Sequence, residues 1–267
     1  MDVWSPSQYH RFAAERRQPF DALAGLCARC EGGVAVDLGC GSGELTKELP
    51  ARLGPRHVLG VDSSPAMLER ARAHVDAQAD VSFAQGDLAT FTSDQPLDLV
   101  FSNAALHWVP QHAAVLGRWR LQLARGGQLA VQLPCNADHP AYRAIAETVD
   151  EQRALFQGAL PTLASAEHVE PPERYAALLH ALGASAMNVH VRVFPHVLAR
   201  PLDVLEWVRG TALHPVRVAL PDEAAYDAFL ASYAARLEHV LGPPDMPYLF
   251  TFKRTFLWAR FDEPAPR

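Results

Sequence analysis

The segment Val34-Ala-Val-Asp-Leu-Gly-Cys-Gly-Ser-Gly43 decides the fold class of this chain. It is an apolar strand that carries an acid, Asp37, and runs into three glycines. A second apolar run, 58–61, ends in another acid, Asp62. Two strands that each end in an acid, with a glycine-rich turn between them, are typical of a nucleoside site in a doubly wound α/β sheet. Asp62 is then placed to accept hydrogen bonds from the ribose hydroxyls, and the glycines let the backbone approach the ligand.

The spacing of the glycines indicates what kind of nucleoside this turn binds. A dinucleotide fingerprint reads G-x-G-x-x-G and directs a helix N-terminus at a pyrophosphate. Here the glycines are Gly39, Gly41 and Gly43, and Glu44 stands where the third glycine of that fingerprint would be. An acid at a helix start repels phosphate, whereas Asp37 suits a cationic amine. The turn therefore favours a nucleoside with an amino-acid tail, and D-L-G-C-G-S-G resembles the first motif of class I S-adenosylmethionine (SAM) methyltransferases.

Composition bounds the size and partners of the protein. A chain of 267 residues, 49% of them hydrophobic, can form one large α/β domain or a sheet domain with a helical insertion. A net charge of -6 and a pI near 6.0 argue against nucleic acid as the main partner. The sequence shows no apolar signal region and no apolar run of membrane-spanning length, so we expect no membrane partner and a cytoplasmic location.

The four cysteines are too few for a disulfide scaffold. Cys27-x-x-Cys30 has the spacing of a metal or redox pair, but no second pair follows and it lies in an apparent helix. A reduced, structural pair is the favoured interpretation, and no metal site is expected.

The order of elements predicts the architecture. Strands alternate with helices through the first half of the chain, which indicates a parallel sheet with right-handed crossovers. We expect strands at 34–38, 58–61, 81–85, 97–101 and 129–133, and helices ending near 53 and spanning 65–75 and about 112–124, the last capped by Gly126-Gly127. The second half is mainly helical over 136–185, followed by a strand at 187–196, helices at 201–213 and 222–241, and a strand at 251–261.

These elements suggest a simple division of the chain. Residues 1–30 are interpreted as an N-terminal lid segment and 31–135 as the SAM-binding Rossmann-like core. Residues 136–267 form the remainder of the same domain, with the last two strands and helical insertions. The two helices between those strands are expected to cap the ligand end of the sheet.

The alternation of residues in the last strand places one charged residue, Arg254, on an aromatic face. With a period of two, Arg254 shares a face with Phe250, Phe252, Phe256 and Trp258, where an unpaired charge is costly. Two interpretations stay open: a structural ion pair with a helix carboxylate, or an anion clamp for the substrate.

Polar residues follow the other strands. Asp87 is placed to accept from an adenine amino group with the Leu88 backbone beside it, or it caps the next short segment. Asn103 lies where the carboxyl ends of strands meet ligands in open sheets. His107 and Trp108 follow on the same lip, as substrate contacts or as packing.

Two further segments carry alternative interpretations. Met67 lies against the adenine or in the core, since a methionine on an amphipathic helix serves either purpose. The segment Trp4–Arg17 mixes aromatic residues with arginine, and it is either a lid over the ligand or a solvated amphipathic helix.

The whole chain resembles the trans-aconitate 2-methyltransferase family. The resemblance rests on W-S-P-S-Q-Y, A-E-R, D-L-G-C-G-S-G, V-D-S-S-P-A-M-L, N-A-A-L-H-W-V-P, V-Q-L-P and the final F-L-W-A-R. It implies a doubly wound seven-stranded sheet with an antiparallel last strand, SAM as cofactor, and methyl esterification of a small polycarboxylic acid. The cofactor contacts expected are Tyr9, Phe12, Asp37, Gly39, Cys40, Gly41, Asp62, Ser63, Met67, Asp87, Leu88 and Asn103, and the acceptor contacts are Arg16, His107, Trp108, Arg209, His214 and Arg254.

The chain departs from the family pattern at two positions. His214 stands where the family tends to have an arginine, and Cys135 stands where an acid commonly follows the V-Q-x-P strand. The fold and cofactor therefore carry over more securely than the acid that is methylated.

Other functions stay open at this point. The acceptor could be a larger or carrier-bound acid, or a phenol, which would need a general base such as His107. A carboxylate needs no base, so for that acceptor no catalytic residue is expected beyond positioning and exclusion of water. A non-catalytic SAM-binding regulatory protein is the alternative outside enzymes. We expect a monomer or a weak homodimer.

Overall fold

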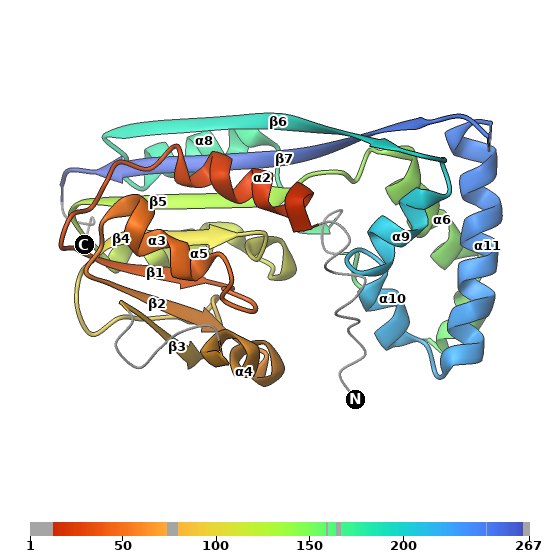
Figure 1. The fold of residues 1–267 in the computed structure, drawn as a ribbon, viewed down its shortest axis with the longest axis horizontal. Helices are drawn as coiled ribbons and strands as arrows, with labels where there is room; N and C mark the ends of the chain where they lie inside the picture. Colours follow the sequence, from red (N-terminus) through yellow and green to blue (C-terminus); the bar gives the residue numbers. More distant parts are fainter. Residues whose placement is uncertain (1–12, 74–79, 159, 164–166, 244, 264–267) are drawn as a thin grey trace. The chain divides into compact units, whose positions relative to one another are not determined.

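The computed structural model describes residues 13–73, 80–158, 160–163, 167–243 and 245–263, and its centre is a seven-stranded sheet (Figure 1). The strand order is β3-β2-β1-β4-β5-β7-β6. Strands β1 to β5 pair in parallel, and β7 pairs antiparallel with β5. This order confirms the predicted doubly wound α/β class and its antiparallel last strand.

The strands are β1 (Val34–Leu38), β2 (His57–Asp62), β3 (Val81–Gln85), β4 (Leu97–Asn103), β5 (Leu123–Pro134), β6 (Ala186–Leu198) and β7 (Tyr248–Phe261). Every residue of β1 is buried, as expected for a central parallel strand that is covered on both faces. The helices are α2 (Ala13–Ala24), α3 (Leu49–Leu53), α4 (Pro65–Ala73), α5 (His112–Leu121), α6 (Pro140–Glu151), α8 (Pro172–Ala181), α9 (Asp203–Arg209), α10 (His214–Ala219) and α11 (Glu223–Leu241).

The helix after β1 ends at Leu53, as predicted. It begins only at Leu49, because the glycine turn continues into a 3-10 turn and Pro50 suits only the first turn of a helix. Two details of the other predicted elements were wrong. Gly126 and Gly127 do not cap α5. They lie inside β5, where a Cβ on Gly127 would approach the Ala124 carbonyl oxygen to 2.8 Å.

The second wrong detail concerns the helices between β6 and β7. Three helices occur there instead of two, because α9 ends at Gly210 and α10 begins at His214 with Pro215 in its first turn. The predicted position of these helices as a cap stays a prediction.

The chain forms two compact units. One contains Cys135–Glu167 and Val193–Lys253, and the other contains Arg16–Pro134, His168–Arg192 and the stretch from Arg254 onward. We call them the insertion unit and the sheet unit. The predicted division at 30 and 135 is not tested by these units and remains a proposal.

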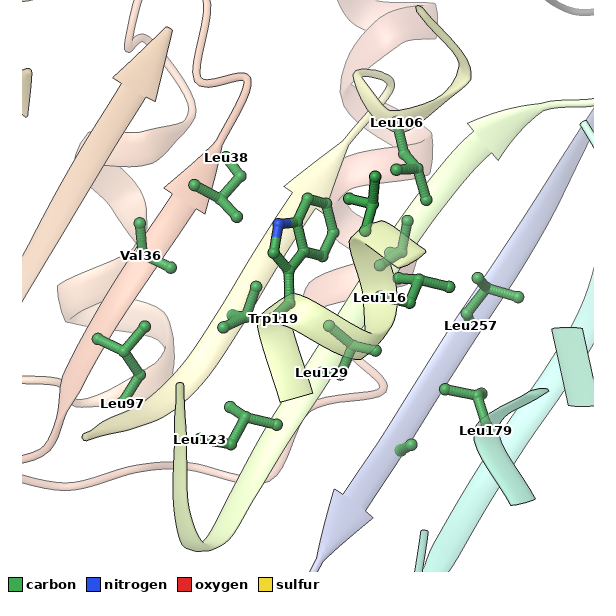
Figure 2. Close-up of a cluster of buried hydrophobic side chains, with 14 of the residues drawn as sticks. Val36, Leu38, Leu97, Leu106, Leu116, Trp119, Leu123, Leu129, Leu179 and Leu257 are labelled. Atoms are coloured by element: carbon green, nitrogen blue, oxygen red, sulfur yellow. The ribbon is translucent and has the colours of Figure 1, made fainter. Parts of the chain in front are cut away.

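One large hydrophobic cluster of the sheet unit lies on one face of the sheet. Val36, Leu38, Leu129 and Leu257 project there and pack with Leu116 and Trp119 of α5 and Leu179 of α8 (Figure 2). Trp119 is fully buried, and its indole Nε1 donates to the Leu88 carbonyl at 2.8 Å.

The opposite face carries polar side chains at the carboxyl ends of the strands. The strand register places Asp37, Asp62, Asn103, Gln132 and Arg254 on this face, since paired residues share a side and residues two apart on a strand do as well. We call it the site face.

Candidate active site

Asp37 is a buried acid on the central strand β1. Asp37 is 4% exposed, and Thr46 Oγ1 donates to its Oδ2 at 2.6 Å. Burial raises the pKa of Asp37 to about 7, with a contribution from the negative charge of Asp62, and the Thr46 hydrogen bond opposes this rise. A carboxyl group in this condition is stabilised as an anion when a cation binds beside it.

Asp62, at the end of β2, is oriented by backbone donors. The Gly41 amide donates to Oδ2 and the Ser64 amide to Oδ1, each at 2.9 Å. Both oxygens are thus fixed in direction while each retains a lone pair for a hydroxyl donor. This geometry suits the two adjacent hydroxyls of a ribose.

The glycine turn between β1 and η1 (Thr46–Glu48) leaves room where a ligand would lie. Gly39 has φ +81°, and a Cβ there would fall 2.1 Å from the Ala105 Cβ. Gly41 has φ +55°, and no atom lies within 4 Å of the position that its Cβ would occupy. The first glycine is required by close packing, and the second opens the backbone to a ligand.

Residues next to this turn are held by local hydrogen bonds. The amides of Gly39 and Cys40 both donate to the Val61 carbonyl, and burial raises the pKa of the Cys40 thiol, which makes it an inert packing group. The exposed Ser63 accepts from Gln85 through its carbonyl, and half-buried Met67 donates to Ser64 Oγ through its amide.

Asp87 and Leu88 follow β3. The Ala89 amide donates to Asp87 Oδ1 at 2.8 Å, so the turn-capping interpretation is observed. Asp87 is exposed, and Leu88 Cδ2 lies 3.7 Å from the position of a Gly39 Cβ, which brings this loop beside the glycine turn. The adenine contact stays a prediction.

The end of β4 is strained. Asn103 is followed by Ala104 with φ 56°, a left-handed conformation that costs a non-glycine residue free energy. The Asn103 Oδ1 atom is buried, and no residue that the structure describes gives it a hydrogen bond. Backbone strain and an unsatisfied polar atom together mark a functional edge.

His107 and Trp108 lie in the 3-10 turn η2 (Leu106–Trp108) after this edge. Their rings are 4.6 Å apart, with His107 6% exposed and Trp108 43% exposed. Burial lowers the pKa of His107 to about 3, and the positive charge of Arg254 lowers it further. His107 is therefore neutral at physiological pH, and it lies within electrostatic reach of Arg254.

Arg254 is 8% exposed and pairs with Pro134, the last residue of β5. Because β7 begins at Tyr248, Arg254 lies near the middle of its strand. The antiparallel pairing places it at the carboxyl end of β5. Its role as anion clamp stays a prediction.

Sequence reasoning did not single out two groups that support this site. Gln132, directly across from Asn103 in the β4–β5 register, is fully buried on the site face. Its signal was a lone polar residue inside the apolar run 129–133. His112 binds both ends of the turn that carries His107, donating from Nε2 to the carbonyls of Leu106 and Val109 at 2.9 Å.

For the remaining predicted residues, the structure shows no contact with the site described above. Tyr9 and Phe12 lie outside the described residues, as does the side chain of Arg16, whose backbone is in α2. Arg209 and His214 belong to the insertion unit, where Arg209 pairs with Glu206 at 3.3 Å and His214 is exposed. Their predicted acceptor contacts stay predictions.

The donor set fits SAM better than a phosphate-bearing cofactor. Asp62 accepts from the Gly41 amide, and Asp37 and Asp87 lie on or after the neighbouring strands β1 and β3. Carboxylates attract an ammonium and accept from hydroxyl and amino groups, whereas they repel phosphate. Among the described residues, no cluster of three or more metal-ligating side chains occurs, and no described helix is long and apolar enough to span a membrane.

Comparisons with known proteins agree with this chemistry. Residues 35–127 match a family described as a methyltransferase domain. The chain is 40% identical to trans-aconitate 2-methyltransferase of Streptomyces coelicolor over 98% of its own length and 88% of the relative's. It is 38% identical to the enzyme of the same name from Deinococcus radiodurans, over 93% of this chain and 95% of that one.

Solved structures show the same fold at low sequence identity. The YcgJ protein of Bacillus subtilis matches with a TM-score of 0.61 and 15% identity, covering 92% of this chain and 99% of that chain. A phosphoethanolamine N-methyltransferase 2 of Haemonchus contortus, in complex with phosphomonomethylethanolamine and S-adenosylhomocysteine, matches with a TM-score of 0.57 and 18% identity. That match covers 92% of this chain and 53% of the nematode protein.

Proposed function

Because the chain belongs to the trans-aconitate 2-methyltransferase family and is a SAM-dependent methyltransferase, we propose that it forms the methyl ester of a small polycarboxylic acid such as trans-aconitate. The observation that carries the proposal is that a buried arginine lies near a histidine whose pKa is too low for it to act as a base. Arg254 lies near His107, whose pKa is lowered to about 3.

An ionised acceptor suits this arrangement. A carboxylic acid with a pKa of about 4 has already lost its proton at neutral pH. When bound, SAM supplies a methyl group on a cationic sulfur, which a carboxylate oxygen can attack without prior deprotonation. A phenol, with a pKa of about 10, would require a base, and His107 is too weakly basic for that role.

The residues of the chain then act by binding and orientation. Asp37 holds the ammonium of the cofactor's amino-acid tail, and Asp62 holds its ribose. Arg254 binds a carboxylate of the acceptor that does not react, since a guanidinium on the attacking oxygen would weaken it as a nucleophile. Fixing the two partners in a near-attack geometry can supply about 7–11 kcal/mol of the barrier reduction.

Exclusion of water provides the other contribution. The attack joins an anion and a cation, so charge decreases on the way to the transition state. Water stabilises the separated charges and slows this step, which a buried site avoids. His107 and Trp108 supply uncharged ring surfaces at the acceptor edge.

The test is a methyl-transfer assay with methyl-labelled SAM and a panel of acceptors. The panel contains trans-aconitate, other di- and tricarboxylic acids, a long-chain acid and a phenol. We expect label in a product that is hydrolysed by mild base, as methyl esters are, and that appears only with the small polycarboxylic acids. Labelling of the phenol alone, or of no acceptor, would contradict the proposal.

A further inference from the structure

Gln132 is a buried carboxamide without an internal partner. The residue is 0% exposed. Among the residues that the structure describes, Oε1 has no hydrogen-bond donor and Nε2 has no acceptor. A buried amide in this condition destabilises the folded protein, because it has lost its hydration without replacement. Such groups persist where a ligand supplies the missing partner.

Gln128 provides an internal comparison on the same strand and face, four residues earlier. Its Oε1 accepts from the Ala28 amide at 2.8 Å and from Trp258 Nε1 at 3.0 Å, and its Nε2 donates to the Ala28 carbonyl at 2.9 Å. Both polar atoms of Gln128 therefore have partners, whereas neither polar atom of Gln132 has one among the described residues. The difference lies in position, since Gln132 is near the carboxyl end of β5.

The strand order places Gln132 on the acceptor side. It lies across from Asn103 on β4 and from Phe256 on β7, and Arg254 follows two residues away on the same face. The acids assigned to the cofactor lie on or after β1, β2 and β3, on the other side of β4. Gln132 thus stands between the cofactor side and the buried guanidinium.

We propose that Gln132 is the specificity-determining contact for the carboxylate that is methylated, with its Nε2 donating to one oxygen of that group. The proposal rests on the proposed function. An amide donor orients a carboxylate without neutralising it, as a guanidinium would. The carboxylate satisfies the Nε2 donor, and the Oε1 acceptor is left for a hydrogen-bond donor of the acceptor molecule or for a water molecule.

The experiment compares Gln132→Met with the matched control Gln128→Met. Methionine keeps the length of the side chain and removes both polar atoms. For Gln132→Met we expect kcat/KM for trans-aconitate to fall about 10- to 100-fold, as for a lost hydrogen bond to a charged group. The Kd for S-adenosylhomocysteine by calorimetry should stay within about twofold, and the Tm should be unchanged or higher because an unsatisfied polar group is removed.

The control should behave in the opposite way. Gln128→Met breaks three hydrogen bonds and should lower the Tm while leaving the acceptor KM of the folded protein near its wild-type value. Gln132→Glu adds a further test, since a carboxylate at this position repels an anionic acceptor and should reduce turnover below that of Gln132→Met.

The outcomes separate this inference from the proposed function. A wild-type protein that methylates none of the acids overturns both. An active wild type with unchanged acceptor kinetics in Gln132→Met overturns the Gln132 inference alone, as does a lowered Tm with an unchanged KM. If Gln132→Met does not fold, the shorter Gln132→Asn decides the question, and a wild-type acceptor KM in that variant overturns the inference.

Discussion

A single buried acid connects cofactor binding with pH. Burial raises the pKa of Asp37 to about 7, so in the free protein the group carries a proton below that pH. The ammonium of the cofactor binds the anion, so the proton must leave. We expect the Kd for S-adenosylhomocysteine to rise as pH falls below 7, approaching tenfold per pH unit. Calorimetry from pH 5.5 to 8.5 measures this, and Asp37→Asn should weaken binding and remove the pH dependence.

Asp62 supplies the second prediction for a single residue. Asp62→Ala removes two charge-assisted hydrogen bonds to the ribose, and we expect a loss of about 2–4 kcal/mol in cofactor binding. It also releases the Gly41 amide, which loosens the glycine turn. The Kd for S-adenosylhomocysteine should rise accordingly while circular dichroism of the variant stays that of a folded protein. An unchanged Kd would refute the ribose assignment.

The sequence predicts some of the site residues and not others. Asp37 and Asp62 could be found because each follows a short, strongly apolar run next to a glycine turn. Gln132 could not be predicted as a site residue, since the sequence does not reveal that its side chain lacks hydrogen-bond partners. That becomes clear only when the strand register with Asn103 and Phe256 is known. A lone glutamine in an apolar strand looks the same whether its amide is satisfied, like that of Gln128, or not.

At the scale of elements, α8 braces the turn that carries His107. The Tyr175 hydroxyl lies 2.6 Å from His112 Nδ1 and accepts from the Glu170 amide at 3.1 Å. Because His112 Nε2 donates to two carbonyls and burial lowers the pKa of the ring, Nδ1 is an acceptor and Tyr175 is its donor.

Removing that hydroxyl tests the brace. Tyr175→Phe should lower the free energy of unfolding by about 1–2 kcal/mol, because it leaves Nδ1 buried without a donor. Urea denaturation measures the loss. Tyr248→Phe is the control, since its hydroxyl makes a longer contact of 3.3 Å with His139 at a half-buried position and should cost less. Equal losses would argue against the brace.

Strand β7 carries the predicted acceptor anchor. Arg254→Lys keeps the charge and loses the bidentate fork, and Arg254→Met loses both. If Arg254 binds an acceptor carboxylate, both variants should raise the acceptor KM about tenfold or more while cofactor affinity and Tm stay near wild type. If it is a structural ion pair, Met should lower the Tm and leave KM alone. That second result would move the anchor to Arg16, Arg209 or His214.

For the whole molecule, the alternation of strands and helices was sufficient to predict the doubly wound sheet, and the family resemblance gave its antiparallel last strand. Local details were harder, because proline and glycine have more than one use. Pro50 lies in the first turn of α3, Pro215 in the first turn of a separate α10, and Gly126-Gly127 lies inside a strand instead of ending a helix. Pro172 opens α8, since proline is compatible with the first turn of a helix.

The protein as a whole should show no essential general base. With a carboxylate acceptor and both substrates saturating, no group in the reaction titrates between about pH 6 and 9, because the acceptor ionises near pH 4. His107, with a pKa of about 3, stays neutral throughout that range. We therefore expect a flat kcat, while kcat/KM for the cofactor falls below pH 7 as Asp37 gains a proton. Steady-state kinetics at each pH separates the two. A kcat that rises steeply through about pH 7 and is abolished by His107→Ala would instead indicate a hydroxyl or phenol acceptor.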